Sequence, residues 1–393
     1  MKRFLAVALA LLLAMLCTSC IRLKPGYGAE EPPTFPQIGD TDTEPSTDED
    51  KILSPTTVFP SWNTVSENAT RFLTDTKNAV VDCTKKEYTY LEMVKDLELL
   101  CEKYPKQLSY SSIGRSVAGR EIYVAVLGNP DASRQILVSA GIHAREYLTP
   151  LLVMKQIEYM LAYLGTGNCN GVSYDDILQK YCFYIVPMSN PDGIMLSQEG
   201  LSTITDTALA DSLISIYHKD FSAGLTTATN VNEYLKYWKA NAVGTDLNRN
   251  FDALWEQYEA ISRPSMFRYK GPSPNSEPET QALVALTERL PNIQAVLCIH
   301  SQGEVVYWNC GQSAALSTDT RAFAAMITGR TGYKLVAEQN NDASYSDWCA
   351  LKKGLIAVTV ETGNGVCPLE IEQFQKIWSD HFDLLLQSAV YFE

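Results

Sequence analysis

Apolar runs separated by polar, Gly-rich and Pro-rich segments mark out the predicted elements of this chain. Leu and Val recur at a helical spacing from Tyr88 to Tyr104 and predict a helix that ends before Pro105. A second helix is predicted from Leu151 to Leu164. Short apolar runs predict strands at 108–114, 120–127, 136–142, 181–188, 295–299 and 356–360. Because strands alternate with helices, we expect an α/β fold: one domain with a mixed, mainly parallel sheet and helices on both faces.

Two segments depart from this pattern. The sequence Asn190-Pro191-Asp192-Gly193 follows a predicted strand and has the residues of a turn. Residues 200–235 place scattered apolar residues in a polar setting, and we interpret them as an insertion into the domain.

The first 20 residues predict an export signal. Met1-Lys2-Arg3 is basic, and the apolar run from Phe4 to Leu16 has 13 residues, fewer than the roughly 20 that span a membrane. Small residues precede Cys20 and resemble a bacterial lipobox, although Cys17 stands where Leu is usual. We therefore expect an exported protein anchored by a lipid on Cys20 to the outer face of the cell membrane. Cleavage and release as a secreted protein, or an uncleaved anchor, are the alternatives.

The next segments predict a tether and an extension. Residues 21–55 are rich in Pro, Thr and acidic residues without apolar periodicity, which is typical of a disordered tether. Residues 56–83 are either a pro-segment or an N-terminal extension packed on the domain that residues 84–393 would form. Residues 21–51 hold eight acidic and three basic residues, so they account for −5 of the net charge of −14. The sequence contains no basic stripe, so we do not expect a nucleic-acid partner.

Cysteines are numerous in the predicted domain. Eight lie between Cys83 and Cys367, and an exported chain permits disulfides. Their spacing does not select a pairing.

Three side chains at predicted strand ends form a candidate zinc site. His143 and Glu146 follow the apolar run that ends at Ile142, and His300 follows the run that ends at Ile299. Imidazole nitrogen and carboxylate oxygen suit Zn²⁺, and a catalytic zinc site takes three protein ligands with one position left open. The carboxyl ends of strands in an open α/β sheet are where ligand sites form. The sequence therefore predicts one zinc ion bound by His143, Glu146 and His300.

Four ordered motifs together resemble the zinc carboxypeptidase family, over roughly residues 85–390. They are His143-Ala-Arg-Glu146, Asp246-Leu-Asn248-Arg249-Asn250-Phe251, His300-Ser-Gln-Gly and Val360-Glu361-Thr-Gly. The resemblance implies an eight-stranded-type sheet and a zinc metallopeptidase of the carboxypeptidase type. It also implies that Glu361 is the general base that takes a proton from the attacking water.

The same resemblance implies further roles in the cleft. Asn248 and Arg249 match the pair that grips a substrate carboxylate, for which a guanidinium fork and an amide are suited. Arg145 matches an Arg of the substrate cleft and is the alternative to Lys239 as the catalytic group that stabilises the oxyanion. Lys239 follows Trp238 at the place of the family's carbonyl-polarising Arg, and we expect it to stabilise an oxyanion as a point charge.

The specificity segment departs from the digestive enzymes. Ser346 stands at the pocket position that otherwise selects apolar or basic side chains, and Gln339 stands near the place of the mobile active-site Tyr. Tyr345 lies nearby and is a candidate substrate contact. The local sequences around Lys239, His300 and Glu361 are similar to those of the bacterial branch of the family that cleaves γ-D-glutamyl-diamino acid bonds.

The leading hypothesis is an exported, monomeric zinc peptidase that hydrolyses the γ-D-glutamyl-diamino acid bond of peptidoglycan stem peptides. Its expected partners are a muropeptide or peptide substrate and a membrane reached through the lipid anchor. A carboxypeptidase that removes C-terminal residues from ordinary peptides is the first alternative. A lipoprotein that binds cell-wall peptides without cutting them is the second.

Overall fold

The computed structural model describes residues 69–75, 78–337 and 342–393. The predicted export signal, Cys20, the tether and Gln339 lie outside these residues. The main sheet has eight strands in the order β1-β2-β6-β3-β7-β10-β8-β9. In chain order they are β1 (Leu108–Arg115), β2 (Glu121–Gly128), β3 (Arg134–Ala140), β6 (Tyr181–Val186), β7 (Ile293–His300), β8 (Val305–Tyr307), β9 (Lys334–Val336) and β10 (Ile356–Glu361). A small hairpin is formed by β4 (Asn168–Cys169) and β5 (Val172–Ser173).

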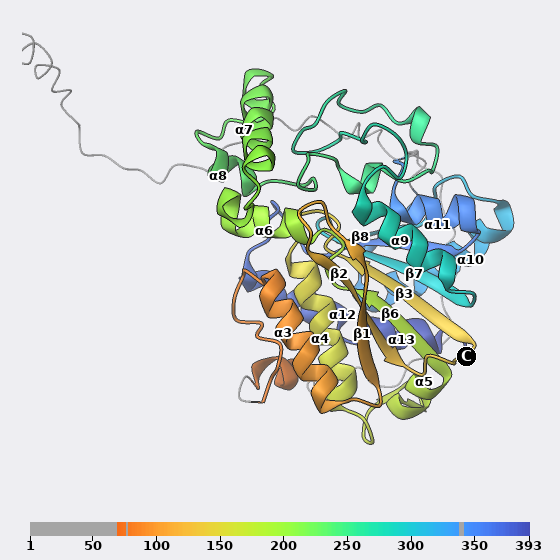
Figure 1. Cartoon of the computed structure of the whole chain (residues 1–393). Helices are drawn as coiled ribbons and strands as arrows, with labels where there is room; N and C mark the ends of the chain where they lie inside the picture. The colour runs from red at the N-terminus through yellow and green to blue at the C-terminus, as the bar shows by residue number, and fades with distance from the viewer. Residues whose placement is uncertain (1–68, 76–77, 338–341) are drawn as a thin grey trace, which may run out of the picture. The chain divides into compact units, whose positions relative to one another are not determined.

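Helices cover both faces of this sheet (Figure 1). They are α3 (Tyr90–Lys103), α4 (Leu148–Ala162), α5 (Tyr174–Lys180), α6 (Pro191–Glu199), α7 (Thr207–Ser222), α8 (Val231–Leu235), α9 (Pro278–Arg289), α10 (Ala314–Thr331), α11 (Tyr345–Lys353), α12 (Phe374–His381) and α13 (Leu384–Val390). The mixed α/β fold with an eight-stranded sheet confirms the predicted fold class. Among the described residues, no helix combines the length and the apolar composition needed to cross a membrane.

The middle of the sheet is parallel. Strands β6, β3, β7 and β10 are parallel neighbours, so their carboxyl ends meet at one edge of the sheet. Alternate residues of a strand point to opposite faces. Ile136 and Val138 of β3 accordingly join a core with α3, α4, α10, α12 and α13, whereas Leu137 joins a second core with α9 and α11. Burial on both faces explains why this strand reads as a continuous apolar run.

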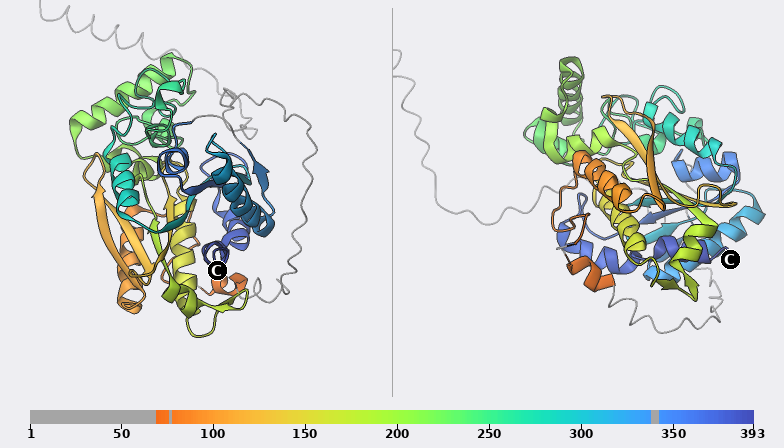
Figure 2. Two further views of the ribbon diagram at one scale, coloured as in Figure 1. Left: turned by 90° about the vertical axis from the view of Figure 1, so that its right-hand side faces the viewer. Right: turned by 60° about the horizontal axis from the view of Figure 1, so that its bottom comes forward.

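One local prediction needs correction. The sequence Asn190-Pro191-Asp192-Gly193 begins helix α6 rather than forming a turn: the Asn190 side chain caps the helix by accepting a hydrogen bond from the Gly193 N–H at 3.0 Å. Pro is favoured in the first turn of a helix because its missing N–H is not needed there. Residues 200–235, which we interpret as an insertion, contain the helices α7 and α8. These helices share a small apolar core with residues outside the segment, among them Leu196, Trp238 and Met266. Figure 2 shows α7 at the periphery of the molecule.

The described part of the N-terminal extension packs on the domain. The Trp378 indole N–H donates to the carbonyl oxygen of Ala69 at 2.9 Å, and the Val80 N–H donates to Glu158 Oε1 at 2.6 Å. Lys155 Nζ donates to the Val81 carbonyl oxygen at 3.2 Å and pairs with Glu158 at 2.8 Å. These contacts tie residues 69–75 and 78–81 to helices α4 and α12, so these two stretches are part of the folded unit.

The cysteines of the described residues are unpaired. Their thiols are free at positions 83, 101, 169, 182, 298, 310, 349 and 367, and six of the eight residues are buried. Burial raises the pKa of the Cys310 thiol to about 12, so it stays protonated and unreactive.

Candidate active site

The three predicted metal ligands meet at the carboxyl edge of the parallel strands. His300 is the last residue of β7, and Ala140, the last residue of β3, is the register partner of Ile299. His143 and Glu146 lie in the short loop between β3 and α4. The adjacent strand β10 ends at Glu361, which is the register partner of His300. Three neighbouring strand ends therefore bring together side chains that are up to 218 positions apart in the chain.

A tight backbone turn shapes the loop after β3. Gly141 has φ +60°, and a Cβ atom there would lie 2.8 Å from Ile194 Cδ1 and 2.9 Å from Pro150 Cγ. Only glycine combines this conformation with so little space. The Glu146 N–H then donates to the His143 carbonyl oxygen at 3.1 Å, which places both side chains on the same side of the loop.

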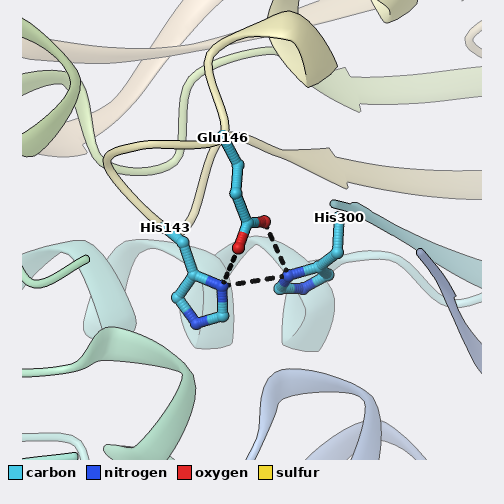
Figure 3. A group of neighbouring side chains, drawn as sticks. All are labelled: His143, Glu146 and His300. Atoms are coloured by element: carbon cyan, nitrogen blue, oxygen red, sulfur yellow. Dashed lines mark hydrogen bonds and ion pairs between the residues drawn. The ribbon is translucent and has the colours of Figure 1, made fainter. Parts of the chain in front are cut away.

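The ligand atoms converge on one point (Figure 3). His143 Nδ1 lies 2.7 Å from Glu146 Oε1, and His300 Nδ1 lies 3.1 Å from Glu146 Oε2 and 3.2 Å from His143 Nδ1. All three residues are buried. Among the described residues they form the one group of three or more metal-ligating side chains whose atoms lie within 4.8 Å of one another.

This arrangement fits a bound cation. Nitrogen and oxygen ligands about 2.0–2.2 Å from a tetrahedral zinc ion lie roughly 3 to 3.5 Å from each other, close to the spacing observed here. Burial would raise the pKa of Glu146, but the neighbouring His143 and His300 outweigh this effect and hold the pKa below its ordinary value. Burial, reinforced by Lys239 and opposed by Glu146, lowers the pKa of His143 and favours the neutral imidazole that binds metal.

Asp246 faces the ring nitrogen of His143 that points away from Glu146 and His300. Its Oδ1 lies 3.3 Å from His143 Nε2, and neither atom forms a hydrogen bond elsewhere among the described residues. Its Oδ2 accepts a hydrogen bond from the Arg268 N–H at 3.0 Å. Burial alone would raise the pKa of Asp246, but Lys239 and His143 hold it well below the ordinary value. A carboxylate on the outer nitrogen of a metal-binding histidine fixes its tautomer and orientation.

Sequence reasoning gave Asp246 no role. It stands in the motif that contains Asn248 and Arg249, but only the fold shows that it faces His143. The position of a buried acidic residue beside a predicted ligand can be recognised only from the three-dimensional structure.

Lys239 lies beside this centre. Its Nζ is 4.0 Å from Asp246 Oδ2, its side chain is 18% exposed, and its carbonyl oxygen accepts from the Ala144 N–H at 3.2 Å. The ammonium group therefore lies close enough to influence both histidines while part of it remains accessible.

Glu361 is half-buried at the end of β10. Burial alone would lower the pKa of His300, but the carboxylate of Glu146 and, to a smaller extent, that of Glu361 raise it. The register of β10 with β7 places Glu361 next to His300 of the ligand set. Arg145 lies in the ligand loop itself, and its Nε is buried without a hydrogen-bond partner among the described residues.

Asn248 and Arg249 lie in a 3₁₀ turn, η2 (Leu247–Arg249). Asn248 Oδ1 accepts from the Tyr345 N–H at 3.1 Å. The Arg249 guanidinium lies over the Tyr258 ring at 5.2 Å, and its Nη2 lies 3.3 Å from Asp342 Oδ2. Burial alone would lower the pKa of Arg249, but Asp342 raises it, so the group stays charged.

The two predicted specificity residues differ in their placement. Ser346 Oγ lies 3.0 Å from Ser344 Oγ and 2.9 Å from Thr359 Oγ1, and Thr359 shares the face of β10 with Glu361. Tyr345, in contrast, is only 1% exposed, and its hydroxyl is hydrogen-bonded to Thr287. The Tyr345 side chain therefore belongs to the core rather than to the substrate cleft, and only its backbone N–H contributes, through Asn248.

The remaining histidines are not ligands. His218 lies on α7, and His381 is fully buried at the end of α12, with Nε2 3.1 Å from Thr362 Oγ1. Burial lowers the pKa of His381 to about 3, so this residue stays neutral in the folded protein.

Comparison with known proteins agrees with this geometry. Residues 93–383 match the zinc carboxypeptidase family. The chain is 30% identical over 305 residues to gamma-D-glutamyl-L-diamino acid endopeptidase 1 of Lysinibacillus sphaericus, covering 77% of this chain and 72% of that protein. It is 28% identical over 221 residues to mast cell carboxypeptidase A of Rattus norvegicus, covering 56% and 46% respectively. The structure of carboxypeptidase A from Helicoverpa armigera matches 84% of this chain and 81% of its own, with a TM-score of 0.57 and 18% identity.

The fold and the His-Glu-His centre thus define a metal-dependent peptidase of the carboxypeptidase type. The chain belongs to the zinc carboxypeptidase family, and it is a zinc metallopeptidase that acts on peptides. His143, Glu146 and His300 are the residues able to hold one ion.

Proposed function

We propose that this chain hydrolyses the γ-D-glutamyl bond to a diamino acid in peptidoglycan stem peptides, with Glu361 as the general base. The observation that carries the catalytic part is the pairing of β7 with β10, which sets Glu361 beside His300 at the edge that holds the metal ligands. A zinc ion held there by His143, Glu146 and His300 would polarise a carbonyl group and lower the pKa of water.

The chain's own groups then supply the remaining chemistry. The Glu361 carboxylate accepts a proton from the attacking water and returns it to the nitrogen of the leaving amine. The Lys239 ammonium lies at the ligand set, where it stabilises negative charge that develops on the carbonyl oxygen. Arg145 lines the cleft next to Glu146, and Asn248 with Arg249 holds a substrate carboxylate.

The substrate class is supported by two observations. The endopeptidase of Lysinibacillus sphaericus is named for γ-D-glutamyl-L-diamino acid bonds, and the similarity spans 77% of this chain. The predicted pocket position holds Ser346, whose hydroxyl bonds to Ser344 and Thr359, so polar groups line it rather than an apolar or acidic selector. Such a lining suits the polar side chain of a diamino acid.

The place of action is part of the proposal. The basic start, the apolar run and Cys20 support export and a lipid anchor on the outer face of the membrane, where peptidoglycan is found. Labelling with a radioactive fatty acid tests this: we expect label on the chain and none on a Cys20→Ser variant. Equal labelling of both proteins would exclude Cys20 as the anchor.

Digestion of defined muropeptides, with products identified by mass, tests the substrate. We expect a product that ends in D-Glu, and a loss of turnover on the order of 10²–10⁴-fold in Glu361→Gln with the zinc content unchanged. Glu256→Gln, at an exposed carboxylate of the 3₁₀ turn η3 (Trp255–Gln257), is the control and should retain activity.

Other outcomes favour the alternatives. Release of C-terminal residues from ordinary peptides without cleavage of muropeptides would identify a carboxypeptidase. Binding of muropeptides without any turnover by the zinc-loaded protein would identify a binding lipoprotein. Full activity in Glu361→Gln would remove the proposed base.

A further inference from the structure

Arg249 has a carboxylate beside it. Asp342 Oδ2 lies 3.3 Å from Arg249 Nη2, in a pair whose side chains are 13% exposed for Arg249 and 29% exposed for Asp342. Two further contacts hold the guanidinium: Nη1 donates to the Asn248 carbonyl oxygen at 2.9 Å, and Tyr258 covers one face. The Asp342 N–H donates to the buried Asp347 carboxylate at 3.2 Å. The carbonyl oxygen, the aromatic ring and Asp347 therefore fix a cation and an anion side by side.

Such a pair suits some substrates and not others. In an ordinary carboxypeptidase substrate the nitrogen next to the terminal carboxylate belongs to the scissile amide and is uncharged. Asp342 would then face the incoming carboxylate as a like charge, which disfavours binding. A free amino-acid centre, in contrast, carries an ammonium and a carboxylate on the same carbon. Its carboxylate matches Arg249, and its ammonium matches Asp342.

We propose that Arg249 and Asp342 together bind the free amino-acid centre at the far end of the substrate's diamino acid. Asp342 is thereby a specificity-determining residue that requires a free amine beside the carboxylate. This inference rests on the proposed function and narrows it to diamino dicarboxylic acids whose distal centre is unmodified. Acylation or loss of the distal amine leaves Asp342 without a cationic group on the ligand, although its pairing with Arg249 remains.

Three matched substrates test this on the zinc-loaded full chain. Each carries a γ-D-glutamyl bond to one residue: diaminopimelate, 2-aminopimelate, which lacks the distal amine, or lysine, which lacks the distal carboxylate. For the unmodified protein we expect kcat/KM to be at least about tenfold higher on the diaminopimelyl substrate than on either analogue, as for the loss of one charge-assisted contact.

Asp342→Asn should abolish the discrimination against 2-aminopimelate. We expect its kcat/KM on the diaminopimelyl substrate to fall about tenfold while that on the aminopimelyl substrate is unchanged or higher. Asp252→Asn removes the same charge at an exposed site paired with Lys352 at 3.0 Å, and should leave the ratio as it is.

The possible failures are distinct. Equal losses on both substrates in Asp342→Asn would mean that Asp342 only holds Arg249 in position. Equal rates of the unmodified protein on the diaminopimelyl and aminopimelyl substrates would exclude amine recognition without any variant. Both results leave γ-glutamyl cleavage intact, whereas cleavage of ordinary C-terminal peptides alone would overturn the proposed function and this inference with it.

Discussion

Replacing Asp246 by Asn tests how the metal site is held. The substitution keeps the shape of a fully buried side chain but removes its charge, 3.3 Å from His143 Nε2. The amide of Asn can donate a hydrogen bond to Nε2, which would move the imidazole proton to Nδ1. Nδ1 is the atom that faces Glu146 and His300, so the favoured tautomer would then be unable to bind zinc.

The expected loss follows from the support that the outer carboxylate gives. Removing such a partner costs about 10–100-fold in metal affinity, or roughly 1.4–2.8 kcal/mol. The burial of Asp246 and the lack of another partner for its Oδ1 place the expectation toward the larger value. Lys239 adds to the effect, because its ammonium loses the opposite charge 4.0 Å away and further disfavours a nearby cation.

Zinc affinity is measured by competition with a chromogenic chelator, and Asp252→Asn is the matched control. Thermal unfolding of the metal-free proteins shows whether the variant is folded. An unchanged zinc affinity in a folded Asp246→Asn protein would refute the reasoning, because His143 would then be oriented without this carboxylate. A loss seen equally in Asp252→Asn would point to net charge instead.

Three further outcomes are expected. Lys239→Met should lower kcat by about 10²–10³-fold with a smaller change in KM, whereas Lys239→Arg, which keeps the positive charge, should retain much of the kcat of the unmodified protein. An equal loss of kcat in the two variants would exclude stabilisation by the charge of Lys239. At a zinc concentration of roughly 1,000 Kd, bound zinc should add about 4 kcal/mol to the free energy of unfolding. Chelation should therefore lower the melting temperature reversibly. An unchanged melting temperature would contradict a site that forms only in the folded state. Burial raises the pKa of Glu279 from 4.5 to about 7, so the folded state retains this proton and urea denaturation should show stability falling as pH rises from 4.5 through 7. Glu279→Gln should flatten that slope, leaving the part due to Asp96, whose pKa burial also raises to about 7; an unchanged slope would exclude Glu279 as its source.

Much of the metal site was predictable because it depends on local order. Strand ends are visible as apolar runs that stop, and the side chains of His143 and His300 follow such stops. Parallel pairing then brings those ends together with no further information. The bounds of β1 and β2 likewise agree with the alternating pattern to within one residue at each end.

Other features depend on contacts that the sequence does not display. Asn190-Pro191-Asp192-Gly193 has the same residues in a turn and at a helix start, and only the packing of α6 decides between them. Tyr345 could face the cleft or the core, and the choice is made by Thr287 on α9. The roles of Asp246 and Asp342 depend on their contacts with His143 and Arg249. These contacts are made between loops, which have no periodic sequence pattern.

The packed extension redefines where the enzyme begins. Lys155 and Glu158 lie on α4, the helix that starts two residues after Glu146, and both satisfy buried charges through the backbone at Val80 and Val81. A protease that removes residues 1–68 would leave the contacts of Val80 and Val81 with α4 in place. A cut after residue 83 would remove the backbone partners of Lys155 and Glu158 at Val80 and Val81, and we expect it to loosen α4, the helix that follows the metal-binding loop.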